Sequence, residues 1–154
     1  MFDWLANPNR FNKITEKIQP YILLITIITL ISGLYFGLFD SPKDYQQGDA
    51  VRIMYVHVPS AWLASFLYFS LAISCVFYLV WKHPLADLVS SSIAPIGALF
   101  SALTLVTGSL WGKPMWGTWW VWDARLTSML VLFFFYLGYI LLSNAFERKI
   151  DGSK

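Results

Sequence analysis

Four long apolar runs constrain the fold of this chain more than any other feature of its sequence. None of them contains an Asp, Glu, Lys, Arg or His, and each approaches or exceeds the roughly 20 residues that a helix needs to cross a bilayer core. The runs are Tyr21–Phe39, Val58–Trp81, Leu88–Trp111 and Leu126–Phe146. Because unpaired backbone polar groups are not tolerated in lipid, such runs fold as helices. We therefore predict an all-α polytopic bundle with four membrane-spanning helices.

Composition supports this class and excludes several others. Of the 154 residues, 57% are hydrophobic and only 13% are charged, whereas soluble domains carry about 25% charged residues. The net charge of +2 is too small to indicate a nucleic-acid surface. Proton-coupled transporters and ion pumps generally need ionisable residues inside their spans, which these runs lack. Neither a nucleophile–base pair nor a metal-binding cluster is recognisable, so we do not expect an enzyme.

The distribution of Lys and Arg predicts the orientation in the membrane. Three lie in residues 1–20, one in the Lys82–Asp87 loop and three after Phe146, which makes seven on one side against four on the other. Cytoplasmic loops carry the excess of positive charge. We therefore expect residues 1–20 to form a cytoplasmic amphipathic segment on the membrane surface, 21–146 the transmembrane domain, and 147–154 a cytoplasmic tail. The loop 40–57 would then face the periplasm.

A tryptophan-rich stretch, residues 111–125, lies on the same predicted side, at the membrane interface. It holds five of the eight tryptophans of the chain, namely Trp111, Trp116, Trp119, Trp120 and Trp122. Pro114 can begin a helix, which would place Trp116, Trp119, Trp120 and Asp123 on one face. A flat indole surface flanked by cations suits a large planar apolar ligand with acidic substituents, such as haem. Composition favours equally an aromatic belt that anchors the spans at the interface.

The chain resembles a known family in this stretch and in others. Trp116–Asp123 resembles the tryptophan-rich WWD motif of haem-handling proteins. The surrounding motifs resemble the C component (CcmC) of the system I cytochrome c maturation pathway; they are Asp44–Gly48, Tyr55–Pro59, Ala94–Ala98 and Thr107–Met115. The resemblance implies a multi-pass protein of the bacterial inner membrane that presents haem at the periplasmic face and delivers it to a haem chaperone. Without a C-x-x-C-H motif, haem b would be held non-covalently and transiently.

The resemblance also implies roles for individual residues. His57 would be an axial ligand of the haem iron, although a lone histidine at this position is more often a helix cap or a headgroup contact. The haem platform would consist of Trp116, Trp119, Trp120, Trp122 and Asp123. Asp123 has the alternative of bonding to indole N–H groups or to a neighbouring arginine. The haem propionates would pair with Arg52, Lys113 and Arg125, for which lipid phosphates are the alternative partners. His83 lies on the opposite side of the membrane.

By resemblance, the partners would be the haem chaperone CcmE, the ATP-binding cassette complex CcmA/CcmB, and CcmD. The family has six spans, with a second periplasmic histidine between the last two. This sequence stops at Lys154, after the fourth run, so we expect a truncated or split chain whose second axial ligand is water, a methionine or another chain. The alternative is an inert fragment, or a structural subunit whose tryptophans only anchor it.

Overall fold

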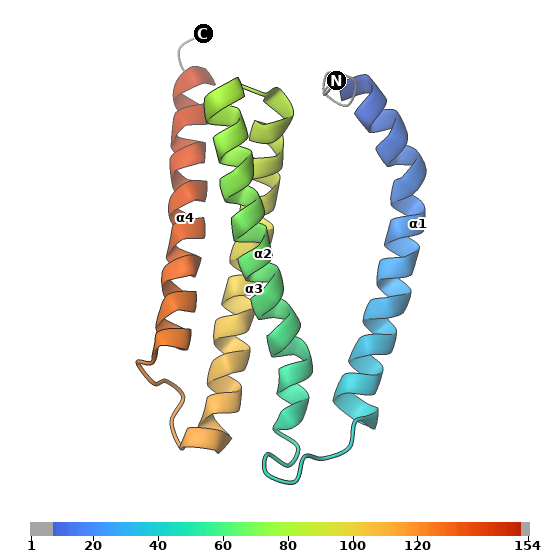
Figure 1. Ribbon diagram of the computed structural model, residues 1–154, viewed down its shortest axis with the longest axis vertical. Helices are drawn as coiled ribbons and strands as arrows, with labels where there is room; N and C mark the ends of the chain where they lie inside the picture. Colours follow the sequence, from blue (N-terminus) through green and yellow to red (C-terminus); the bar gives the residue numbers. More distant parts are fainter. Residues whose placement is uncertain (1–7, 152–154) are drawn as a thin grey trace. The chain divides into compact units, whose positions relative to one another are not determined.

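The computed structural model describes residues 8–151 and contains four long helices (Figure 1). The elements are α1 (Pro8–Tyr35), a short π-helix η2 (Phe36–Asp40), α2 (Val51–Trp81), α3 (Pro84–Trp116) and α4 (Ala124–Asp151). Four helices among the described residues are long and apolar enough to cross a membrane. The predicted all-α fold with four candidate spans is therefore confirmed. The chain divides into two compact units at Pro42–Lys43, and each unit is described by itself.

The helices extend beyond the apolar runs that predicted them. The second helix begins at Val51 rather than Val58, and the third continues past Trp111 to Trp116. The length of an apolar run matches the thickness of the hydrocarbon layer, whereas the helix itself can continue into the membrane interface wherever capping and packing allow it. The predicted tail is likewise helical as far as Asp151, and residues 152–154 lie outside the described part of the chain.

The first unit consists of α1 and η2. The expected surface segment is continuous with the first apolar run in one helix, which passes through Pro20 without ending, while residues 1–7 lie outside the described part. Its apolar side chains from Tyr21 to Leu34 are exposed nearly all around the helix. A helix that is apolar on every face is suited to lipid or to other helices. The position of residues 8–20 on the membrane surface stays a prediction.

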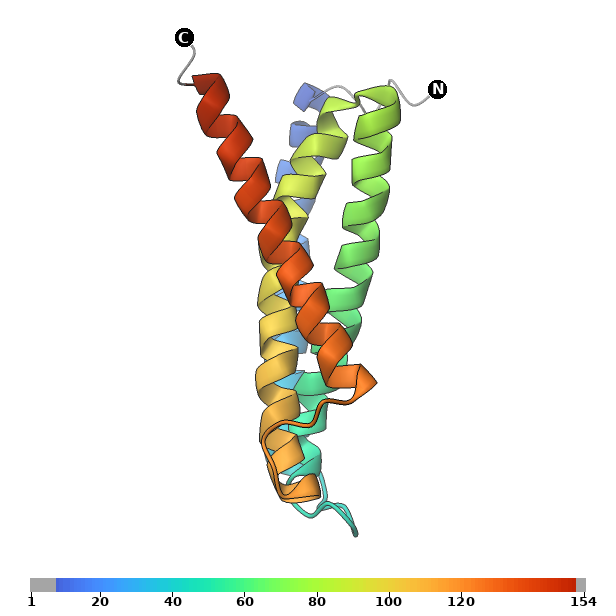
Figure 2. The same cartoon turned by 90° about the vertical axis from the view of Figure 1, so that its left-hand side faces the viewer.

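The second unit is built on α3, which packs against both α2 and α4. The helices α2 and α3 are antiparallel, and α4 crosses them obliquely (Figures 1 and 2). Small residues at helical spacing let these backbones approach closely: Ala94, Ala98 and Ser101 of α3 are all buried. A larger share of α3 is buried than of the other candidate spans, so α3 lies inside this bundle.

Tyr136 ties the three helices of this unit together. Its side chain is fully buried, and its hydroxyl donates a hydrogen bond of 2.8 Å to the backbone carbonyl of Ala64 on α2. The phenol ring reaches this carbonyl across Gly97 of α3, where a Cβ atom would overlap the ring. Because Gly97 has no side chain, Tyr136 of α4 can pass α3 and form its hydrogen bond with α2.

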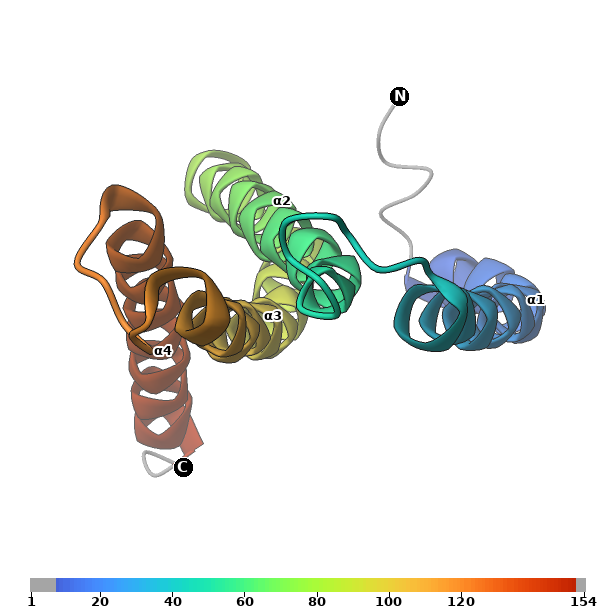
Figure 3. The ribbon, with the colours of Figure 1, turned by 90° about the horizontal axis from the view of Figure 1, so that it is seen from below.

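The start of α2 and the end of α3 lie at one end of this unit (Figure 3). The loop 43–50 is held there by reciprocal backbone bonds between Asp44 and Gly48, and the Asp44 carboxylate accepts the N–H groups of Gln46 and Gln47. Trp111 Nε1 donates a 2.9 Å hydrogen bond to Gln47 Oε1. The loop and the tryptophan-rich stretch are therefore neighbours, as an antiparallel α2–α3 pair requires.

Candidate functional site

A cavity of about 240 Å³ lies between α2, α3 and α4 at this end of the second unit. Its lining is mostly apolar. The side chains in it that could bind a ligand are Met54, His57, Trp111, Trp116, Arg125 and Met129. A mostly apolar cavity with a few convergent polar groups is the usual form of a small-molecule site, so this cavity is the candidate site of the described residues.

His57 is fixed in the cavity wall by contacts with α3. It is half-buried, and its Nδ1 atom lies 3.0 Å from Oγ1 of Thr107. A Cβ atom at Gly108 would come within 3.1 Å of the Cε1 atom of the ring. The Cε1–Nδ1 edge of the imidazole therefore lies against Gly108, which has no side chain. The side chain of His57, the predicted axial ligand of the iron, thus has a defined orientation in the structure.

Two tryptophans form the aromatic part of the cavity wall. The rings of Trp111 and Trp116 are edge-to-face, with their centroids 5.2 Å apart, an arrangement that aromatic pairs favour. Trp111 is anchored by its bond to Gln47, and the ring of Trp116 packs near Gly112. The wall is thus connected to the loop 43–50.

The prediction that Pro114 begins a helix is wrong. Pro114 lies inside the last turns of α3, which continues to Trp116 and ends at Gly117. Gly117 has a φ of 76°, and its N–H donates a 3.1 Å bond to the carbonyl of Lys113. A glycine in the left-handed conformation is a common helix terminator. Because residues 117–123 are not helical, Trp116, Trp119, Trp120 and Asp123 do not share a helix face.

The predicted haem platform is consequently divided between the cavity and the loop that follows α3. Trp116 lines the cavity, whereas Trp119, Trp120 and Trp122 do not. Trp119 is 54% exposed beneath the Nζ atom of Lys113, and Trp122 is 77% exposed with its ring edge-to-face against Trp120. The Nε1 atom of Trp120 is buried without a hydrogen-bond partner among the described residues. These three indoles therefore lie outside the cavity lining.

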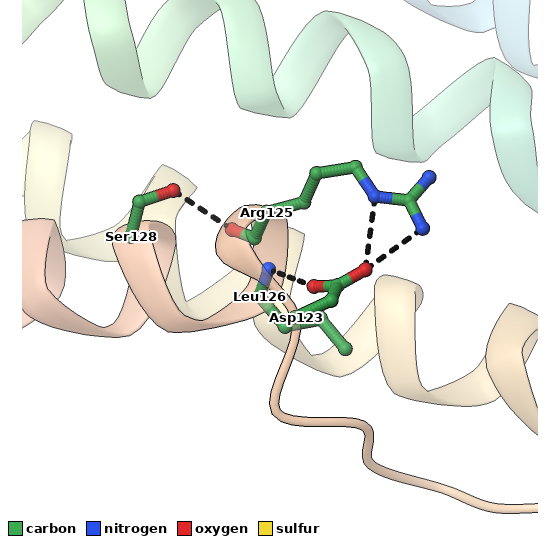
Figure 4. Close-up of polar contacts among 4 residues, drawn as sticks. All are labelled: Asp123, Arg125, Leu126 and Ser128. Carbon is green, nitrogen blue, oxygen red and sulfur yellow. Dashed lines mark hydrogen bonds and ion pairs between the residues drawn. The ribbon is translucent and has the colours of Figure 1, made fainter.

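Arg125 is the predicted cation that lines the cavity, and Figure 4 shows its contacts with Asp123. Its Nε and Nη2 atoms donate to Oδ2 of Asp123 at 3.0 and 2.8 Å, and its guanidinium lies 5.3 Å from the centroid of the Trp116 ring. The other two predicted cations lie outside the lining. The ammonium of Lys113 donates to the carbonyl of Gly117, and Arg52 lies 3.8 Å from Asp49.

Asp123 caps α4 and orients Arg125. Its Oδ1 atom accepts the backbone N–H of Leu126 at 2.8 Å, while Oδ2 accepts from Arg125. The Leu126 N–H and then the Arg125 guanidinium hold the pKa of Asp123 below its usual value. Carboxylates at helix N-termini are stabilised in this way. Asp123 was expected either to form part of the haem platform or to bond to indole N–H groups or a neighbouring arginine. The structure contains the bond to Arg125.

Acid should therefore loosen the start of α4. A lowered carboxyl pKa means that the stabilisation is complete above the ordinary pKa of about 4 and is lost as the pH falls through the lowered value. We expect the tryptophan fluorescence of the protein in detergent to change below about pH 4, because Arg125 then leaves Trp116. Asp123→Asn, which keeps the capping oxygen but has no charge to lose, should lack this transition. If the transition persists in Asp123→Asn, it belongs to another acid such as Asp49.

Sequence reasoning missed three residues of the site, namely Thr107, Gly108 and Trp111. Together with Thr104 they occupy positions i, i+3, i+4 and i+7 on one face of α3, and Thr104, Gly108 and Trp111 line the cavity. This small and polar face within an apolar run was a usable signal. Periodicity could not show, however, that this face of α3 packs against His57 of α2. His83 lies at the other end of the unit, where it precedes α3. Met54 lines the cavity and Met115 does not.

Comparison with known proteins identifies the family. The family model described as Heme exporter protein C matches residues 1–154. The chain is 52% identical to the Heme exporter protein C of Bradyrhizobium diazoefficiens, over 93% of this chain and 54% of that protein. It is 50% identical to that of Haemophilus influenzae over the full chain and 64% of that protein, and 48% identical to that of Escherichia coli K12 over 96% and 61%.

The chain thus spans between about half and two thirds of the length of these curated relatives. The motifs at its cavity and in its tryptophan-rich stretch lie within the matched residues. With a family model over its whole length and relatives at about 50% identity, this chain belongs to the Heme exporter protein C family.

Proposed function

We propose that this chain handles haem during cytochrome c maturation and holds it at the cavity between α2, α3 and α4, with His57 as an axial ligand of the iron. Family membership supports the haem-handling role, since the relatives are named as exporters of haem. The observation that carries the proposal is His57 in the wall of an apolar cavity beside Trp111 and Trp116. Neutral imidazole is a common haem ligand.

The size of the cavity indicates how haem would sit. Its volume of about 240 Å³ is below the roughly 300–1,000 Å³ of pockets that enclose a drug-sized ligand. The described residues would therefore hold one side of the macrocycle and leave the rest outside. Such a partly exposed haem, bound non-covalently as haem b, suits a protein that passes it on. Trp119, Trp120 and Trp122 follow Trp116, which lines the cavity, and in this proposal they would cover the exposed part.

Arg125 is the cation best placed for a haem propionate, because it lines the cavity. Its guanidinium is already paired with Asp123 through two nitrogens, which fixes it in place while leaving Nη1 to bond a second acceptor. Lys113 and Arg52 would reach a propionate only from outside the lining. We propose Arg125 as the main propionate contact and the other two as peripheral ones.

We further propose an inner-membrane location with cytoplasmic termini and a periplasmic cavity. The excess of Lys and Arg on the opposite side supports this orientation. Haem would then be delivered to CcmE, in association with CcmA/CcmB and CcmD. A single cysteine introduced at Thr118, in a variant whose Cys75 is replaced by serine, should react with a membrane-impermeant maleimide in intact spheroplasts. Labelling only after the cytoplasmic side is opened would reverse the orientation.

The haem absorption spectrum of the purified chain tests the central proposal. His57→Ala should abolish haem binding by the isolated chain, because it removes the imidazole of the cavity. His83→Ala, at the other end of the bundle, is the matched control and should leave the spectrum unchanged. Equal spectra in wild type and His57→Ala would show that the iron is ligated elsewhere.

The alternative to haem binding is that the tryptophans anchor the protein at the membrane interface, and one observation favours it. Trp119 and Trp122 are strongly exposed, as tryptophans of a membrane-interface belt are. Replacing Trp119 and Trp120 together with alanine separates the two roles. Loss of haem with normal membrane insertion would assign them to haem, whereas a lower protein level with normal haem content would assign them to anchoring.

A further inference from the structure

The hydroxyl of Thr107 has only one hydrogen but three hydrogen-bonding neighbours, of which the backbone carbonyl of Thr104, at 3.3 Å, is the most distant. Its Oγ1 atom lies 2.7 Å from the backbone carbonyl of Leu103, one turn earlier on α3, and 3.0 Å from Nδ1 of His57 on α2. The side chain is buried. The bond to Leu103 selects the rotamer of this β-branched residue and aims its lone pairs away from the helix. The contact with His57 therefore depends on which group supplies the hydrogen.

Two arrangements of hydrogens are possible, and they differ in the number of bonds they make. If His57 carries its proton on Nδ1, the ring donates to Thr107 and Thr107 donates to Leu103, so that both hydrogens are used. If the proton is on Nε2, Thr107 turns its hydrogen to Nδ1 and gives up its bond to Leu103. The backbone carbonyl of Thr104, which lies 3.3 Å from Thr107 Oγ1, is also a hydrogen-bond partner of His57. The first arrangement keeps the bond from Thr107 to Leu103, a net hydrogen bond is worth about 0.5–1.5 kcal/mol, and linked bonds reinforce one another.

We propose that Thr107 is a positioning residue of this site, whose hydroxyl accepts the Nδ1–H of His57 and so holds the imidazole in the tautomer with a free Nε2 lone pair. The proposal rests on the proposed function in one respect: the Nε2 lone pair is the one that would ligate haem iron. A ligating histidine generally donates its other N–H to a fixed acceptor, which sets its tautomer and ring orientation.

The contacts around the ring support this assignment. A Cβ built at Gly108 has the Cε1 and Nδ1 atoms of His57 at 3.1 and 3.6 Å as near neighbours, so this edge of the ring is the one that lies against α3. A ring shift or flip would separate Nδ1 from Thr107. The hydrogen bond and the close packing at Gly108 thus fix the same orientation.

Nitrogen-15 NMR of the haem-free protein in detergent tests the tautomer directly. The ring nitrogens are labelled in histidine, and the two histidines are told apart with His83→Gln. We expect wild-type His57 to carry its proton on Nδ1. Thr107→Val, which keeps the shape but removes the hydroxyl, should convert His57 to the Nε2–H form or to a mixture, and Thr107→Ser should restore it. Ser60→Ala removes another buried hydroxyl bonded to a carbonyl one turn away and should have no effect.

Haem titration of the same variants supplies the second readout. Thr107→Val should bind haem roughly 10- to 100-fold more weakly, while Thr107→Ser and Ser60→Ala should bind like the wild type. An Nε2–H tautomer in the wild type, or an Nδ1–H tautomer that survives Thr107→Val, would overturn the proposal whatever haem does. If the NMR result is as expected but the wild type binds no haem, the proposed function fails and the assignment of Thr107 to the tautomer stands.

Discussion

Gly97→Ala is expected to destabilise the three-helix unit by about 2–4 kcal/mol. The added methyl group would overlap the phenol ring of Tyr136, which is fully buried and cannot move without opening the contact between α3 and α4. Displacing the ring would also break its 2.8 Å bond to the Ala64 carbonyl. The apparent free energy of unfolding, from titration of the purified protein with SDS, measures this effect.

Gly138→Ala is the matched control, because it lies in the middle of α4 with nothing within 4 Å of its Cβ position. Alanine is the better helix former by up to about 1 kcal/mol, so this variant should be neutral or slightly stabilised. Tyr136→Phe should cost less than Gly97→Ala, because it removes the hydrogen bond but keeps the ring. Equal stability of Gly97→Ala and Gly138→Ala would contradict the packing of Tyr136 against α3.

Gly108→Val should weaken haem binding at least 10-fold, an effect of the size seen when a ligand's supporting contacts are lost, while His57 itself is kept. The Cβ atom alone would lie 3.1 Å from Cε1 of His57 and 3.4 Å from Leu126. The two further methyl groups of valine must displace the imidazole or fill the cavity. Gly108→Ala, which requires a shift of only a few tenths of an ångström, should have a smaller effect in the same direction.

The measurement is a haem titration monitored by the absorption spectrum, with unfolding by SDS measured in parallel. Gly138→Val, also on a transmembrane helix but outside the lining of this cavity, controls for a β-branched residue in a helix. Haem affinity that does not fall from glycine through alanine to valine at position 108 would show that haem does not bind beside His57.

Much of the architecture follows from the sequence, since four runs without a charged residue have few alternatives to membrane-spanning helices. The burial of α3 was also predictable from its small residues, because Ala94, Ala98 and Ala102 recur four residues apart. The helix ends were less predictable. Helices α2 and α3 extend past their apolar runs because side chains at an interface can reach water without ending the backbone hydrogen bonds of the helix.

The tryptophan-rich stretch shows the limit of local reasoning. Pro114 locally favours the start of a helix, yet it lies inside the last turns of α3. The glycine at 117 in the left-handed conformation ends α3, and with it the expected common face of Trp116, Trp119 and Trp120. Trp116 instead pairs with Trp111, whose own position depends on the bond to Gln47 in a distant loop.

The sequence by itself determined the class of the protein, its four apolar helices, its family and the candidate ligand His57, because these depend on composition, run length and local motifs. Only the tertiary structure decided what surrounds that histidine. Thr107 and Gly108 reach it from 50 or more residues away in the chain, and Arg125 is held in the cavity wall from α4. Such contacts depend on how helices rotate and cross, which hydrophobic periodicity constrains only to a face.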